Sequence, residues 1–342
     1  MSDTTEFSEA KRALLEKYMR GDLPQKTAVA HVITKHAAAE VADQRERVVP
    51  VQTGGSKRPF FYLHGDWAGR AFYCYPLAQA LGADQPFYML EPYNFDDLPV
   101  PPTFETMAAA HLKSMRAVQP EGPYLLGGWC NGGLIAYEMA LQLLAQGQQV
   151  DLMVLLDSDG PHPAYRRLIR SVISFFSNLL RLSQDKQVDL FLLVQHIFRY
   201  LLYSHYRLRF SHYRRSKNTE QLEIIKQDEI GPRRGKVGFR LPRIDPLVPT
   251  AEVLRQDWPS VYEWTAYGYV PSRLYPGKIV FFWDNEDSWR PVWWRKVIEA
   301  KANEVEVYKL PGTHYTLRTE DVHVLAEYLK MHLDRAQSAV TT

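Results

Sequence analysis

Short apolar stretches alternate with amphipathic ones along most of the chain, and this alternation constrains the fold more than any other feature. Apolar runs typical of buried strands occur at 60–63, 86–90, 123–128, 150–157, 278–283 and 305–310. Helical patterns lie between or after them, at about 72–81, 103–119, 132–146, 290–302 and 320–333. Strands without a polar face, separated by helices, predict an α/β fold with a mostly parallel sheet and helices on both faces.

A long interruption separates the fourth of these strands from the fifth. Residues 160–276 are far too many for a loop, and they show helical patterning at 168–182, 188–203 and 219–225. An insertion that leaves the carboxyl end of a strand lies over the edge where such sheets bind ligands. We therefore predict a helical lid insertion.

The predicted organisation follows from this pattern. The core comprises 47–159 and 277–335, the lid comprises 160–276, and 336–342 form a C-terminal tail. Residues 1–46 carry two helical patterns and are expected to form an appendage or linker, unless these helices simply pack against the domain.

Composition narrows the class of protein. The chain has 342 residues, of which 46% are hydrophobic and 23% are charged, as in ordinary globular proteins. Two cysteines cannot make a disulfide scaffold, and free thiols suit a reducing compartment. The N-terminal segment lacks an apolar core, and the longest apolar stretch, 188–203, is interrupted by charged residues. We therefore expect a cytoplasmic protein without a membrane segment.

The sharpest local motif is Gly-Trp-Cys-Asn-Gly at 128–132, between a predicted strand and a predicted helix. This is the context of a nucleophile elbow, with Cys130 at the position usually held by serine. Flanking glycines let strand and helix approach, and the N–H of Asn131 points to where an oxyanion forms. A helix N-terminus also favours the thiolate. The alternative is that Cys130 is a small buried residue in a glycine-rich turn.

In folds with a nucleophile elbow, an acidic residue and then a histidine follow the nucleophile along the chain. Asp157 ends the next predicted strand, with Asp159 close by, while Asp284 and Asp287 form a second possible acid site. His314 lies in a glycine-bounded loop after the last strand and is the candidate base. The remaining histidines are expected to be structural or solvated, including His64, His111, His162 and His323.

These residues suggest roles in acyl transfer. Cys130 attacks a carbonyl and becomes acylated, while His314 moves the protons and Asp157 holds the imidazole tautomer. The second oxyanion donor is expected at the backbone N–H of Asp66 or Trp67, after the first strand. The remaining cysteine, Cys74, falls in the next helix and is expected to pack in the core. We expect neither a cofactor nor a metal.

Several motifs together resemble the type I thioesterase domains of polyketide and nonribosomal peptide synthetases. They are the runs at 48–52, 54–55, 60–65, 123–133, 136–140, 155–157 and 312–314, within a likeness that covers about 47–335. The resemblance implies an α/β-hydrolase fold with a helical lid. It also implies a substrate held as a thioester on the phosphopantetheine arm of an acyl or peptidyl carrier protein. A weaker likeness links 8–24 to linkers between synthase modules.

Cys130 departs from the serine of most members of this family. Moving an acyl chain from pantetheine to Cys130 exchanges one thioester for another, so the acyl-enzyme stays activated. We therefore expect release or transfer to a nucleophile other than bulk water, although hydrolysis, cyclisation and carrier-to-carrier transfer all stay open. The alternatives are an unrelated α/β-hydrolase acting on a free small ester, and a binding module without activity.

The net charge of +2 conceals an uneven distribution. Residues 162–243 hold 17 Lys and Arg against 6 Asp and Glu, whereas the rest of the chain holds 24 against 33. A basic lid predicts docking of an acidic, phosphate-bearing partner such as a carrier protein. The alternative is a solvated face of the lid helices. Aromatic residues lie among these basic residues, a pattern that is also typical of RNA-binding segments. No sequence signature of a nucleic-acid-binding fold accompanies them, so we expect no nucleic-acid partner.

Overall fold

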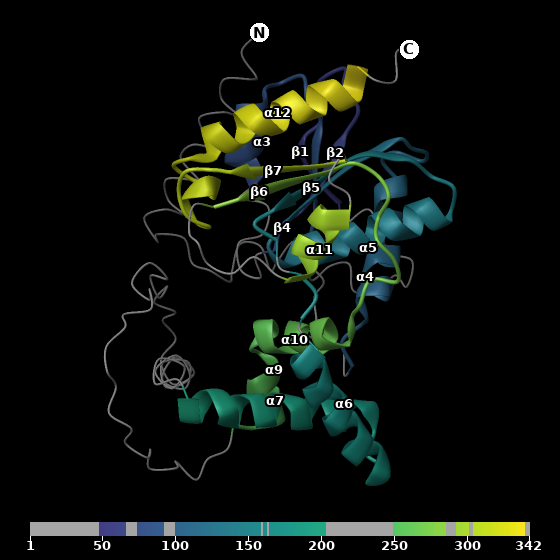
Figure 1. The fold of residues 1–342 in the computed structure, drawn as a ribbon, viewed down its shortest axis with the longest axis vertical. Coiled ribbons are helices and arrows are strands. Elements are labelled where there is room, and N and C mark those ends of the chain that lie inside the picture. Colours follow the sequence, from purple (N-terminus) through teal and green to yellow (C-terminus); the bar gives the residue numbers. More distant parts are fainter. Residues whose placement is uncertain are drawn as a thin grey trace, which may run out of the picture. The chain divides into compact units, whose positions relative to one another are not determined.

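The computed structural model describes residues 48–65, 74–91, 100–158, 160–162, 164–202, 249–284, 292–300 and 304–338. Its centre is a seven-stranded sheet in the order β1-β3-β2-β4-β5-β6-β7 (Figure 1). The strands are β1 (Val48–Gln52), β2 (Phe60–Leu63), β3 (Phe87–Leu90), β4 (Tyr124–Trp129), β5 (Val150–Leu156), β6 (Ile279–Trp283) and β7 (Val305–Lys309). Only β1 pairs antiparallel, and every other neighbouring pair is parallel. The predicted fold class is confirmed.

Helices cover both faces of the sheet, which explains why every residue of β2, β4 and β6 is buried. On one face, α3 (Tyr75–Leu81) and α12 (Val322–Ser338) share a core cluster with side chains of β2, β4, β5 and β6. On the other face lie α4 (Phe104–Arg116), α5 (Asn131–Ala145) and α11 (Val292–Ala300). Trp294 of α11 contacts Tyr137 of α5 and Phe281 of β6.

The predicted core helices are present, with ends that differ by a few residues. Thr103 caps α4 as expected, because its hydroxyl accepts a hydrogen bond from the Thr106 N–H. α12 continues to Ser338, beyond the expected end at 333. Its last turn is held by tertiary contacts that periodicity alone does not reveal.

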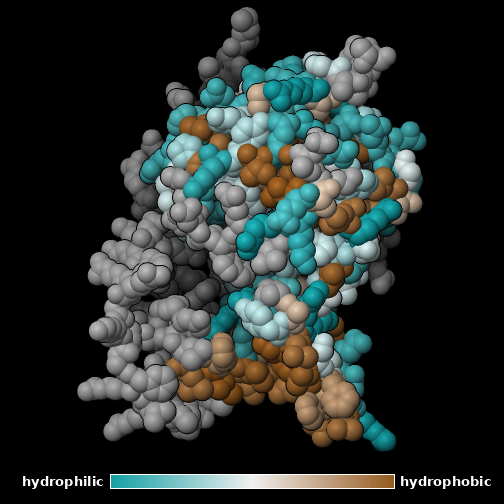
Figure 2. Space-filling model, viewed as in Figure 1, coloured by the Kyte–Doolittle hydropathy of each residue, from teal (hydrophilic) through white to brown (hydrophobic). Residues whose placement is uncertain are grey.

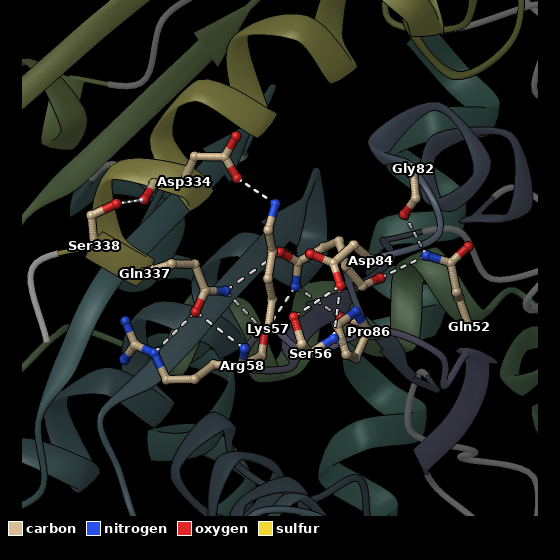
Figure 3. Close-up of polar contacts among 11 residues, drawn as sticks. Gln52, Ser56, Lys57, Arg58, Gly82, Asp84, Pro86, Asp334, Gln337 and Ser338 are labelled. Atoms are coloured by element: carbon tan, nitrogen blue, oxygen red, sulfur yellow. Dashed lines mark hydrogen bonds and ion pairs between the residues drawn. The ribbon is translucent and has the colours of Figure 1, made fainter. Parts of the chain in front are cut away.

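A polar network joins the last turn of α12 to the segment before β2 (Figure 3). Arg58 donates hydrogen bonds to Asp151, Pro123 and Gln337, while Gln337 donates back to the Arg58 carbonyl. Beside it, Lys57 pairs with Asp334 at the exposed rim. The network ties the C-terminal helix to the end of the sheet opposite the elbow.

The chain divides into two compact units. Residues 43–195 and 248–342 form the unit with the sheet, and 1–42 with 196–247 form the other. Of the second unit only 196–202 are described, so the helices expected within 1–46 and at 219–225 lie outside the described residues. The predicted domain boundaries stay a prediction.

The described residues of the predicted lid form four helices: α6 (Ala164–Leu179), α7 (Gln184–Leu202), α9 (Ala251–Arg255) and α10 (Trp258–Gly268). Sequence analysis missed α9 and α10. α6 packs on α10 through Arg170, which donates to the Trp264 carbonyl at 2.9 Å and lies over its ring at 4.4 Å. No helix in the described part of the chain is long and apolar enough to span a membrane.

The described part of the lid presents an apolar face where a basic one was expected. Figure 2 shows apolar side chains gathered over α6 and α7; those more than half exposed are Tyr165, Leu168, Phe175, Phe176, Leu179, Leu180 and Phe198. Arg166 and Arg170 are engaged in packing against α10. Most of the other basic residues in 162–243 lie outside the described residues, so docking of an acidic partner at the lid stays a prediction.

Candidate active site

Cys130 lies on a sharp turn between the buried strand β4 and the helix α5. Its backbone has φ 49° and ψ −122°, a conformation that is strained for a residue with a side chain. The turn is closed by glycines that leave no room for a Cβ atom. A Cβ on Gly65 would lie 2.4 Å from the Trp129 carbonyl oxygen, and one on Gly128 would lie 2.6 Å from the Gly132 oxygen.

The two cysteines occupy different surroundings. Cys74 is 1% exposed within the core cluster, as expected, and burial raises the pKa of its thiol far above the ordinary range. Cys130 is partly exposed at the elbow. A buried thiol with a raised pKa is a poor nucleophile, so Cys130 is the reactive candidate of the pair.

Asp157 lies beside the elbow because β4 and β5 are parallel neighbours. Trp129 and Leu156 are paired in register, and the Cys130 N–H donates to the Leu156 carbonyl at 2.9 Å. Asp157 follows directly, with φ 43°, and its N–H donates to the Phe282 carbonyl of β6. The nucleophile and acid candidates therefore occupy equivalent positions at the carboxyl ends of adjacent strands.

His314 reaches this edge from the loop after β7. Gly312 enables the turn with φ 100°, and the hydroxyl of Thr316 accepts a hydrogen bond from the Thr313 N–H. His314 Nδ1 bonds the Asp157 carboxylate, with both side chains mostly buried. Asp284 is buried at the end of β6, whereas Asp159 and Asp287 lie outside the described residues.

The other imidazole nitrogen has a partner that sequence analysis did not anticipate. The indole Nε1–H of Trp129 donates to His314 Nε2 at 3.2 Å. Because an indole is a donor only, Nε2 must be unprotonated, which places the proton of the neutral ring on Nδ1. Nδ1–H therefore donates to Asp157, the tautomer that a general base in such a triad requires. The only sequence signal was that Trp129 directly precedes Cys130.

The oxyanion region is partly described. α5 begins at Asn131, so its first backbone N–H groups lie directly after Cys130. The loop leaving β2 passes close by, since a Cβ on Gly65 would lie 2.6 Å from the Asn131 nitrogen. Asn131 Nδ2 also donates to the Gly65 carbonyl at 3.4 Å. The expected second donors, Asp66 and Trp67, lie outside the described residues.

α10 contacts the elbow directly, which sequence analysis also missed. The Tyr262 hydroxyl donates to the Asn131 carbonyl at 3.0 Å, and its ring packs on Phe104 at the start of α4. Thr265 donates to the Pro102 carbonyl. A thiol on an elbow, a carboxylate-held imidazole and adjoining helix N–H groups are the components that nucleophilic acyl transfer requires.

Comparison with known proteins finds a likeness to thioesterase domains. The family model "Thioesterase domain" matches residues 58–171. A dimodular nonribosomal peptide synthase of Bacillus subtilis (strain 168) is 34% identical over 158 residues, which cover 46% of this chain and 7% of that protein. A non-reducing polyketide synthase of Pseudevernia furfuracea is 40% identical over 107 residues, covering 31% of this chain and 5% of that protein.

The chain thus spans less than a tenth of these relatives. A crystal structure of a holo four-domain nonribosomal peptide synthetase bound to AMP and glycine shares the fold. Its TM-score is 0.51 at 19% identity, over 83% of this chain and 20% of that one. Residues 58–171 therefore match the thioesterase-domain model, and the sheet and its helices share the fold of the synthetase structure.

Proposed function

We propose that this chain is a thioesterase that accepts an acyl, polyketide or peptidyl chain from a carrier-protein thioester onto Cys130. The observation that carries the proposal is the bond between His314 Nδ1 and Asp157 at the sheet edge where Cys130 forms a strained elbow. This combination supplies a nucleophile, a base and an orienting carboxylate in the chain order expected of the fold.

The first half-reaction exchanges one thioester for another. His314 Nε2 takes the thiol proton of Cys130, and the resulting thiolate attacks the acyl carbonyl to form a tetrahedral oxyanion. The carbon–sulfur bond to pantetheine then breaks, and the departing thiolate takes the proton from the imidazolium. The products are acylated Cys130, free pantetheine thiol and a neutral His314. Asp157 stabilises the imidazolium while it exists.

The carrier-bound substrate is inferred from the relatives. Their names identify nonribosomal peptide and polyketide synthases, which supports a place in natural-product biosynthesis. An acidic carrier protein docking at the lid, where the sequence over 162–243 is basic, is part of this proposal. A cytoplasmic location also belongs to the proposal, because the free thiols suit a reducing compartment.

Cys130 favours release to an acceptor other than water. The acyl-enzyme keeps the activation of the original thioester, which a serine ester would lose, so transfer to a second thiol or to a nucleophile within the chain stays accessible. We expect Cys130→Ser to shift the products towards hydrolysis. Full rates with an unchanged product profile in that variant would refute this preference.

The direct test is a mass measurement on the intact chain incubated with butyryl-pantetheine, and then with an acyl-loaded carrier protein. We expect one acyl group on the wild type and on Cys74→Ala, and none on Cys130→Ala. The Cys74→Ala variant is the matched control because it removes the other thiol. An adduct that persists in Cys130→Ala would overturn the assignment of the nucleophile.

The same measurement separates the alternatives. Acylation by a free ester but not by a loaded carrier would support an unrelated esterase. No adduct with either donor would support a binding module. Transfer from the acyl-enzyme to a second carrier thiol, rather than release of an acid or a ring, would support a carrier-to-carrier shuttle.

A further inference from the structure

The contact between Trp129 and His314 has a direction that bears on proton transfer. The indole Nε1–H donates to Nε2, with the two ring centres 5.3 Å apart and the rings inclined at 61°. Nε2 is also the nitrogen that takes the proton of Cys130 in the proposed mechanism. The indole and the thiol therefore compete for one lone pair.

The indole is firmly held in this position. Trp129 is 1% exposed and packs in the core cluster that includes Leu77 of α3 and Leu329 of α12. The guanidinium carbon of Arg318, from the short helix η4 (Thr316–Arg318), lies 5.6 Å from the centre of its ring. A cation over the ring face draws electron density from the indole, which strengthens its N–H as a donor.

Several groups lie around the imidazole. Asp157 on β5 bonds Nδ1, and Tyr315, at 5.5 Å between ring centres, is 54% exposed. The Arg318 guanidinium lies over the rings of Trp129 and Tyr315. The Trp129 contact exists only with the neutral ring, because an imidazolium would turn a second N–H towards the indole N–H.

We propose that Trp129 is a positioning residue that holds His314 as the neutral ring with its proton on Nδ1. This inference rests on the proposed function of the triad. In the free enzyme, the contact keeps Cys130 mainly as a thiol. In the acyl-enzyme, where no thiolate balances an imidazolium, the contact keeps His314 ready to accept the proton of the incoming nucleophile.

The test is Trp129→Phe in the full chain, which keeps an aromatic ring and removes the N–H. Alkylation of Cys130 by iodoacetamide forms a carbon–sulfur bond and releases iodide, and peptide mass mapping follows it at each pH. At about pH 7 we expect Cys130 of the variant to be alkylated about threefold to tenfold faster, because this factor corresponds to the free energy of one ordinary hydrogen bond. At acid pH, where both proteins carry the imidazolium and lack the contact, the rates should converge.

The matched control is Trp264→Phe, which removes a buried indole of α10 that packs against Arg170. It should follow the wild type at every pH. Equal rates for Trp129→Phe and the wild type throughout would overturn the inference. An increase of the same size at all pH values would also overturn it, because that is what a loosened fold produces.

A second measurement follows the contact in the wild-type chain itself. The chain has eight tryptophans, and ¹⁵N labelling of their indoles gives one N–H signal each. We expect the Trp129 signal, identified by its loss in Trp129→Phe, to move with pH in step with Cys130 alkylation. A Trp129 signal that stays constant would overturn the inference, whereas a missing acyl adduct on Cys130 would overturn the proposed function itself.

Discussion

Replacing Arg58 by methionine tests how much of the fold's stability depends on a single, partly buried guanidinium. Arg58 donates to the Asp151 carboxylate at 2.7 Å, to the Pro123 carbonyl at 3.0 Å and to the Gln337 amide oxygen at 3.3 Å. Figure 3 shows the last of these bonds. The side chains of Arg58 and Asp151 are 19% and 9% exposed. Methionine keeps the aliphatic part of the side chain and removes the guanidinium. The decrease in the free energy of unfolding therefore reports on these hydrogen bonds rather than on packing.

The expected decrease in the free energy of unfolding follows from how far the ion pair is buried. Removing one partner of a buried ion pair costs about 3–5 kcal/mol because the other charge is left uncompensated. Asp151 still accepts a hydrogen bond from Gln149 at 2.8 Å, so we place Arg58→Met at the lower end, about 3 kcal/mol of unfolding free energy. The neighbouring pair of Lys57 and Asp334, 25% and 44% exposed, is worth about 0.5 kcal/mol.

Urea unfolding followed by tryptophan fluorescence measures both variants. Lys57→Met is the matched control, since it removes the adjacent cation in the same way from an exposed pair. We also expect Asp151→Asn to recover part of the loss in the Arg58→Met background, because it removes the stranded charge. Equal losses for Arg58→Met and Lys57→Met, or no recovery in the double variant, would refute the reasoning.

Three further outcomes are expected. Asp157→Asn should slow acylation by about 10⁴-fold through the wrong imidazole tautomer, with an unchanged urea midpoint; a loss below about tenfold would contradict this role. Gly65→Ala should slow acylation by at least about 10²-fold, because its Cβ would lie 2.4 Å from a backbone oxygen of the elbow, whereas Gly54→Ala, with its nearest neighbour at 3.7 Å, should react normally. Burial, followed by the charge of Arg166, lowers the pKa of His162 to about 4 from 6.5. The unfolded chain therefore binds a proton that the folded chain does not, and stability is lost as pH falls from about 6.5 to about 4; parallel stability curves for wild type and His162→Phe would argue against it.

The core of the fold was predictable because its signals are local. Apolar runs such as those forming β4 and β5 cannot be half-exposed, and glycines on either side of Cys130 mark the elbow within five residues. The lid was less predictable. α9 escaped detection because it has only five residues. α10 escaped because its packing surface is largely aromatic and is completed by a residue far away in sequence, Arg170.

The candidate site also has features that the sequence predicts and features that only the folded chain reveals. The sequence by itself indicated the elbow and the order of the candidate nucleophile, acid and base, because chain order and strand ends are properties of a single chain segment at a time. Only the tertiary structure decided that Asp157 holds His314 and that Trp129 occupies the other nitrogen. Those contacts join residues 157 and 185 positions apart, and they exist because β4, β5, β6 and β7 lie side by side and end at the same edge.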